Sequence, residues 1–238
     1  MSDDRQPPSQ LRVPVVAIDG PGGAGKGTIS RLAAEALGWH YLDSGALYRL
    51  TGLAARRAGI ELDDESGLAG LARELDIRFD TGVSDRVWLS GEDVSTLIRS
   101  ETAGADASVI AALPLVRQAL LSRQHAFRQA PGLVADGRDM GTVVFPDAEV
   151  KIFLTASAQE RTNRRYKQLI AKGIDVNIRD LLAEIEQRDA RDSQRSIAPL
   201  RPAEDAEILD TTGVGIEQVL EKVLVLVRSE QAGQRATR

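Results

Sequence analysis

A glycine-rich segment near the start of the chain contains the residue types needed to hold a polyphosphate. Its nine residues are Gly20, Pro21, Gly22, Gly23, Ala24, Gly25, Lys26, Gly27 and Thr28. Glycines let the backbone fold around an anion so that several N–H groups point at phosphate oxygens. Lys26 can place its ammonium against the outer phosphates, and Thr28 can offer a hydroxyl to Mg²⁺. The plainer alternative is a strand-to-helix turn with a solvated lysine.

The flanking sequence favours the phosphate loop. Residues 13–19 form an apolar run before it, and residues 29–34 open a helix after it, whose positive end adds to the attraction for an anion. This context indicates nucleoside triphosphate binding but not what receives the phosphate. Gly27 takes the place of the usual Ser or Thr after the lysine, and this form resembles nucleoside monophosphate kinases rather than GTPases or helicases.

Five further charged residues have the spacing or position expected of a phosphate-binding site. Arg188, Asp192 and Arg195 are spaced to share one face of a helix. If that face lines a nucleotide-binding cleft, two guanidinium groups can bind phosphates and a carboxylate can bind a ribose hydroxyl. Arg49 and Arg138 each follow a predicted strand, where ligands bind in open α/β sheets. A solvated face of Arg–Asp pairs is the alternative for the helix, and only the phosphate loop argues against it.

Four segments in this order closely resemble the bacterial cytidylate kinases: the phosphate loop and residues 42–49, 135–142 and 188–195. The resemblance runs from about Val13 to Arg228. It implies a kinase that transfers the terminal phosphoryl group of ATP to CMP or dCMP, giving CDP or dCDP. Such transfer depends mostly on positioning and charge neutralisation, so Mg²⁺ and arginines are the expected machinery.

The resemblance also implies roles for individual residues. Lys26, Arg138, Arg188 and Arg195 are expected to be catalytic. The residues expected to contact the acceptor nucleotide are Ser44, Tyr48, Arg49, Ser108, Arg117, Arg138, Asp139, Arg188, Asp192 and Arg195. Of these, the resemblance makes Ser108, Arg117 and Asp139 the cytosine contacts. Their chemistry suits that role, since a carboxylate accepts from the exocyclic amine of cytosine and would face an acceptor on uracil. Taken alone, Ser44 has the alternative of a helix N-cap and Tyr48 that of a core residue.

Two expectations concern the donor nucleotide. Arg161, Arg164 and Arg165 open a helix in the region that forms a mobile lid in nucleoside monophosphate kinases. We expect Arg161 and Arg165 to bind ATP, although the sequence does not decide which arginine makes the contact and a solvated helix is the alternative. Closure of the lid would exclude water from the site. Asp136 ends an apolar strand and is expected to hold Mg²⁺ through water, although a hydrogen bond to the phosphate loop is an equal alternative. Asp19 is an acidic candidate of lower weight.

Composition limits the remaining function classes. The chain has 238 residues, with 42% apolar and 27% charged, which is typical of a globular protein with a sizeable core. The net charge of −5 argues against a protein built to neutralise nucleic acid. The absence of cysteine excludes disulfides and thiolate sites, and two histidines argue against a multi-histidine metal site. Without a signal peptide or a long apolar run, we expect a cytoplasmic protein that binds no membrane, and we expect a monomer.

Short β-branched runs alternate with amphipathic stretches, which predicts an α/β fold of the P-loop NTPase type with a parallel five-stranded sheet. The predicted strands are residues 13–19, 39–42, 133–136, 150–154 and Glu207–Asp210. The predicted helices are Lys26–Leu37 and residues 46–58, 114–129, 158–172, 178–193 and 216–228. Residues 60–110 break this rhythm with a helix-like stretch at 64–75 and two short strands at 77–81 and 87–89. We interpret them as an inserted, antiparallel monophosphate-binding lobe.

These elements predict a single kinase domain over residues 12–228. The core is expected at 12–59 and 111–228, the lobe at 60–110 and a helical lid at 158–195, with tails at 1–11 and 229–238. Two other functions compete with the kinase. A GTPase-like switch requires an Asn-Lys-x-Asp element, which residues 172–175 do not supply. An RNA-binding module is weakened by the net acidity and by the small number of aromatic residues available to stack on bases.

Overall fold

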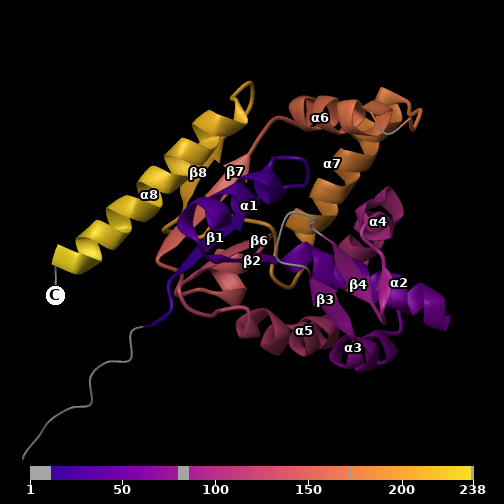
Figure 1. Cartoon of the computed structure of the whole chain (residues 1–238). Coiled ribbons are helices and arrows are strands. Elements are labelled where there is room, and N and C mark those ends of the chain that lie inside the picture. Colours follow the sequence, from indigo (N-terminus) through magenta and orange to yellow (C-terminus); the bar gives the residue numbers. More distant parts are fainter. Residues whose placement is uncertain (1–11, 80–85, 172, 237–238) are drawn as a thin grey trace, which may run out of the picture.

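The computed structural model describes residues 12–79, 86–171 and 173–236, and its centre is a parallel sheet (Figure 1). The sheet has the strand order β2-β6-β1-β7-β8. Its strands are β1 (Val15–Asp19), β2 (His40–Asp43), β6 (Leu133–Gly137), β7 (Val150–Thr155) and β8 (Glu207–Asp210). All neighbouring pairs are parallel, so the five carboxyl ends lie along one edge. The predicted fold class is confirmed.

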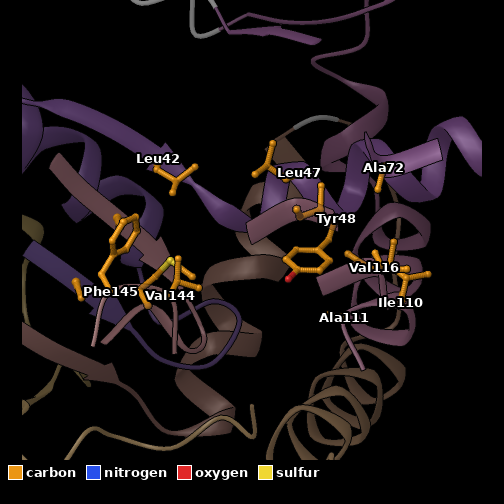
Figure 2. Close-up of a cluster of buried hydrophobic side chains, with 14 of the residues drawn as sticks. Leu42, Leu47, Tyr48, Ala72, Ile110, Ala111, Val116, Val144 and Phe145 are labelled. Atoms are coloured by element: carbon orange, nitrogen blue, oxygen red, sulfur yellow. The ribbon is translucent and has the colours of Figure 1, made fainter. Parts of the chain in front are cut away.

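Helices cover both faces of the sheet. Successive side chains of β1 point to opposite faces, and all of them are buried. Val16 and Ile18 pack with α1 (Lys26–Leu37) and α8 (Ile216–Ala236). Val15 and Ala17 point to the opposite core, which contains α2 (Ser44–Ala58), α5 (Pro114–Ala126) and the π-helical turn η2 (Met140–Val144). Figure 2 shows part of this second cluster, with the ring of Tyr48 among its apolar side chains. Strands buried on both faces account for the nearly continuous apolar runs in the sequence.

The inserted lobe follows α2. Its elements are α3 (Glu65–Glu74), β3 (Ile77–Phe79), β4 (Val87–Leu89), β5 (Glu92–Asp93), η1 (Leu97–Arg99) and α4 (Glu101–Ile110). The three strands form an antiparallel sheet, while α3 packs against α5 and α4 against α2. The expected strand at 77–81 is described only as far as Phe79. Helix α4 was not predicted, because it is built of small residues buried on several sides and so lacks a clear apolar stripe.

Two helices lie beyond the carboxyl edge of the sheet, in orange at the upper right of Figure 1: α6 (Ala158–Ala171) and α7 (Ile178–Gln194). They pack against each other, and α7 also contacts α4. Helix α7 ends one residue before Arg195, which is its C-cap. The expectation of a tail at 229–238 is wrong over residues 229–236, which continue α8. The apolar spacing stops at Val227, but residues with good helix propensity carry the helix further.

Among the described residues, no single helix is both long and apolar enough to span a membrane; α4 and α5 pass that length and composition test only as a pair bent by 105°.

Candidate active site

A cleft of about 1280 Å³ opens at the carboxyl edge of the sheet. The phosphate loop forms one side, and α2, α4, the segment after β6 and α7 form the others. Nearly all residues singled out from the sequence line it: Gly22, Gly23, Ala24, Gly25, Lys26, Gly27, Thr28, Ser44, Tyr48, Arg49, Ser108, Arg117, Asp136, Arg138, Asp139, Arg165, Arg188, Asp192 and Arg195. Four others, Asp19, Gly20, Pro21 and Arg161, do not line the cleft.

The phosphate loop needs glycine at two positions in particular. A Cβ on Gly20 would lie 1.9 Å from the carbonyl oxygen of Leu154, so a side chain cannot be accommodated there. Gly25 is the N-cap of α1 with a φ of 94°, a left-handed conformation that favours glycine. The N-cap residue of α1 makes no side-chain capping hydrogen bond in the described part of the chain. The first-turn N–H groups of that helix therefore face the cleft without a side-chain acceptor, as an anion site requires.

Lys26 lies on the floor of the cleft. Its Nζ donates to the carbonyl oxygen of Pro21 at 2.9 Å and lies 3.9 Å from Oδ1 of Asp136. Burial, followed by the positive charge of Arg138, lowers the pKa of Lys26, and burial raises the pKa of Asp136. Both ionic groups are thus held away from bulk water beside the phosphate loop.

Arg138 and Arg188 converge on the phosphate loop from two different elements. A Cβ on Gly22 would lie 3.6 Å from Nη2 of Arg138 and 3.8 Å from Nη1 of Arg188. Burial and then the like charge of Arg138 lower the pKa of Arg188 to about 10. Nε of Arg188 and Nη2 of Arg195 are buried with no hydrogen-bond partner in the described parts of the chain. Neighbouring cations with unfilled donors are the arrangement that a bound phosphate would complete.

Asp192 of α7 joins three elements at the centre of the cleft. Its Oδ1 accepts from Oγ of Ser108 on α4 at 2.8 Å, and its Oδ2 accepts from Nε of Arg138 at 3.0 Å. Burial by itself raises the pKa of Asp192, but Arg138 and Arg188 outweigh it and lower the pKa below its usual value. Asp192 is therefore an ionised carboxylate with a fixed orientation.

A second ion pair lies at the part of the cleft formed by α2 and α5. Arg117 of α5 donates to the carboxylate of Asp139, and its Nη1 donates to the hydroxyl of Tyr48 at 3.3 Å. Burial raises the pKa of Tyr48 to about 12, so this hydroxyl stays neutral. Carboxylate, guanidinium and hydroxyl together offer acceptors and donors to a polar planar ring.

Arg161 does not have the position expected of an ATP contact. Its side chain is buried, donates to the carbonyl oxygens of Gly22 and Ala156 at 3.1 and 3.0 Å, and forms a two-point ion pair with Asp189. It lies behind the phosphate loop because these four acceptors satisfy its guanidinium there.

The other two arginines near the start of α6, Arg164 and Arg165, line the cleft. Arg165 pairs with Glu101 at the start of α4, so it connects α6 to the inserted lobe. Arg164 donates to Glu160 at 2.9 Å and to Oγ1 of Thr211 at 3.0 Å. Its Nη1 also donates to the carbonyl oxygen of Ala24 at 3.5 Å, and a Cβ on Gly25 would lie 3.8 Å from the same atom, so Arg164 lies beside the phosphate loop.

At the start of α2, the residue that caps the helix is not the one that the sequence suggested. Asp43 rather than Ser44 is the N-cap, with its Oδ1 accepting from the N–H of Ala46 at 2.9 Å. Ser44 donates to Oε1 of Gln124 at 2.8 Å. Arg49 lies 3.7 Å from Asp43. Sequence reasoning assigned no role to Gln124, Asp189 or Thr211. Asp189 lies within the segment 188–195, but nothing in its spacing identifies Arg161 as its partner.

The residues expected to hold Mg²⁺ can be compared with the oxygen donors that the structure places near the phosphate loop. Asp19 does not line the cleft, and its two carboxylate oxygens accept from the N–H groups of Met140 and Gly141. No cluster of three or more acidic, histidine or cysteine side chains able to hold a metal occurs in residues 12–79, 86–171 and 173–236. Mg²⁺ in phosphoryl-transfer sites is held largely by substrate phosphates and water, with one or two protein ligands. The hydroxyl of Thr28 and the nearby carboxylate of Asp136 fit that requirement.

Comparison with known proteins identifies the family. The family model described as cytidylate kinase matches residues 16–229. The chain belongs to the cytidylate kinase family. It is 61% identical to the cytidylate kinase of Stutzerimonas stutzeri (strain A1501) over 89% of this chain and 94% of that protein. It is also 61% identical to the cytidylate kinase of Aeromonas hydrophila subsp. hydrophila, covering 92% and 94%. Among solved structures, a gluconokinase from Sinorhizobium meliloti 1021 aligns with 94% of this chain and 98% of its own, at a TM-score of 0.49 and 14% identity.

Proposed function

We propose that this cytidylate kinase family member transfers the terminal phosphoryl group of ATP to CMP and dCMP. The observation that carries the proposal is the meeting, in one cleft, of the phosphate loop with the guanidinium groups of Arg138 and Arg188. The loop is suited to the polyphosphate of the donor. The arginines are suited to an acceptor that brings a phosphate of its own.

The donor is expected to lie along the loop and the start of α1. Backbone N–H groups of residues 22–28 bind the phosphates of ATP, and the ammonium of Lys26 turns from Pro21 towards the outer phosphates. Thr28 and, through water, Asp136 would hold Mg²⁺, which neutralises charge on the phosphate oxygens when it is bound. We assign the ATP contact of the lid to Arg164 or Arg165, because both line the cleft and Arg161 does not.

The acceptor is expected to lie across the cleft. Arg49, Arg138, Arg188 and Arg195 bind the phosphate of CMP, and the unfilled donors of Arg188 and Arg195 support this assignment. The ionised carboxylate of Asp192, oriented by Ser108, accepts from the sugar. Ser44 and Tyr48 contribute to the same wall of the cleft.

Base selectivity is assigned to Asp139 and Arg117. The carboxylate accepts from the exocyclic amine of cytosine, and the guanidinium donates to the ring nitrogen or carbonyl oxygen. Uracil presents a carbonyl oxygen in place of the amine, so Asp139 would lose its donor and face an acceptor. A buried polar group without a partner makes this discrimination strong.

The chemical step is an in-line displacement. An oxygen of the CMP phosphate forms a bond to the γ-phosphorus of ATP, the bond from that phosphorus to the bridging oxygen breaks, and ADP leaves with CDP as the product. Arg138 and Arg188 stabilise charge on the oxygens in transit, since both lie beside the loop. Closure of α6 and α7 keeps water from taking the place of CMP. A cytoplasmic monomer acting in pyrimidine nucleotide metabolism stays a prediction from the sequence.

The test is an ADP-release assay with ATP and Mg²⁺ in which the acceptor is CMP, dCMP, UMP, AMP or absent. We expect strong stimulation by CMP and dCMP, weak stimulation by UMP and almost none by AMP. ADP release that does not depend on the acceptor would instead favour a nucleotide-hydrolysing switch. Equal use of all four monophosphates would contradict the assignment of the base site.

A further inference from the structure

Asp19, the last residue of β1, binds two main-chain N–H groups from a distant segment. Its Oδ1 accepts from the N–H of Met140 and its Oδ2 from that of Gly141, each at 2.8 Å, and the side chain is buried. These N–H groups belong to the first residues of η2, where a helical turn has no acceptor of its own. Asp19 therefore caps η2 from another strand, directly before the phosphate loop.

Asp139 occupies the N-cap position of the same turn but does not cap it. Aspartate is a favoured N-cap because its side chain accepts from the N–H groups that follow. Here the side chain of Asp139 makes no capping hydrogen bond and pairs with Arg117 instead. Two aspartates thus divide two tasks: Asp19 satisfies the N–H groups of η2, while Asp139 points towards the base-recognition end of the cleft.

We infer that Asp19 is a positioning residue for base selectivity, because its capping of η2 leaves the carboxylate of Asp139 available to Arg117 and to the base. The inference rests on the proposed function, which assigns cytosine recognition to Asp139. When Asp19 is changed, the two buried N–H groups no longer both have a carboxyl acceptor, and the nearest replacement is the carboxylate of Asp139. That carboxylate then turns from Arg117 towards its own backbone, as N-cap aspartates normally do.

The groups around Asp19 are consistent with a role in holding this segment. Lys26 of α1 and Asp139 are the charged groups whose fields act on the Asp19 carboxylate. Lys151 of β7 packs its methylene groups against the same segment, since a Cβ on Gly141 would lie 3.1 Å from Cδ of Lys151 and 3.5 Å from Oδ2 of Asp19. Gly141, two residues after Asp139, is therefore closely packed by Lys151 and hydrogen-bonded by Asp19.

The first test compares Asp19→Asn with wild type. The amide keeps the size of the side chain and one acceptor oxygen, but its NH₂ group faces the second N–H. We expect the preference for CMP over UMP in kcat/KM to fall by about tenfold or more, with the KM for ATP changed less than about twofold. Asp147→Asn is the matched control, because Asp147 pairs with Arg12 and Arg128 outside the cleft. An unchanged preference, or an equal loss of CMP and ATP use as expected of general damage, would overturn the inference.

A double-mutant cycle shows whether Asp19 acts through Asp139. If it does, Asp19→Asn introduced together with Asp139→Asn lowers the base preference no further than Asp139→Asn alone. Additive losses would overturn the inference. If the wild-type protein does not phosphorylate CMP at all, the proposed function is wrong. If Asp19→Asn keeps the wild-type preference for CMP over UMP, only the role of Asp19 is wrong.

A measurement on the unchanged protein covers the case in which Asp19→Asn does not fold. Scalar couplings across hydrogen bonds are expected from the amide nitrogens of Met140 and Gly141 to the carboxyl carbon of Asp19, and none from those nitrogens to Asp139. Couplings to the carboxyl carbon of Asp139 would overturn the inference, since Asp139 would then cap its own turn.

Discussion

Arg161 and Asp189 form a two-point ion pair that joins α6 to α7 behind the phosphate loop. Nη1 of Arg161 lies 3.1 Å from Oδ1 of Asp189, and its Nη2 lies 2.5 Å from Oδ2. The same guanidinium donates to the carbonyl oxygen of Gly22. Because Asp189 follows Arg188 directly, we expect this pair to influence how closely Arg188 approaches the phosphate loop.

The first prediction concerns this ion pair. Asp189→Asn leaves the buried guanidinium of Arg161 without its charged partner, so we expect the free energy of unfolding to fall by about 1–3 kcal/mol. The KM for CMP and the rate of transfer should both worsen by about tenfold or more, because Arg188 is no longer held at Gly22. Urea unfolding and steady-state kinetics measure the two effects. Loss of stability with wild-type kinetics would show that the pair does not position Arg188.

The second prediction is that replacing Arg188 lowers activity without lowering stability. Burial and Arg138 lower the pKa of Arg188 to about 10, and its Nε has no hydrogen-bond partner in the described residues. Arg188→Met should therefore fold with a melting temperature equal to or above that of wild type. Phosphoryl transfer to CMP should fall by about two orders of magnitude or more, since a charge that stabilises the transition state is gone. A clear loss of thermal stability would mean that Arg188 serves the fold rather than the ligand.

The elements that hold the site were predictable from local patterns. Continuous apolar strands, helices after them and the loop that carries Lys26 all leave a signal within a few residues, and the structure has them nearly where they were expected. Partnerships between distant residues leave no such signal. Asp189 lies 28 positions from Arg161, and Asp19 lies 121 positions from Met140, so only the folded chain shows that they meet.

The residues that the family resemblance predicts to contact cytosine show the same limit of sequence-based prediction. Ser108 and Arg117 have no feature of spacing or neighbourhood that distinguishes them from other polar helical residues, and only the family resemblance pointed to them. Ser108 lies on α4, a helix that the apolar pattern did not reveal because its buried residues are small. Both residues line the cleft only because α4 and α5 pack against neighbouring elements of the fold.

The third prediction addresses Lys26. Lys26→Ala removes a buried ammonium whose partners among the described residues are Pro21 and Asp136, so the variant should remain folded. Transfer from ATP to CMP should fall by several orders of magnitude, because the outer phosphates lose their cation. Lys222→Ala, an exposed position on α8, is the control and should transfer phosphate at the wild-type rate. Normal turnover in Lys26→Ala would contradict the role of the phosphate loop.

The fourth prediction uses the titration of Asp19. Burial, opposed by its two backbone hydrogen bonds, raises the pKa of this carboxyl from 3.8 to about 7. Between these values the folded protein holds a proton that the unfolded chain has released, so stability falls as pH rises through the window, by up to about 1.4 kcal/mol per pH unit. Asp19→Asn lacks this titration, while Lys26 and Asp139, whose fields act on Asp19, are present in both proteins. The difference in free energy of unfolding, wild type minus variant, should therefore decrease between pH 5 and pH 7 and level off above it. Urea titrations of both proteins at half-unit pH intervals measure the difference, and a value that stays constant between pH 5 and pH 7 would show that the carboxyl of Asp19 is ionised throughout.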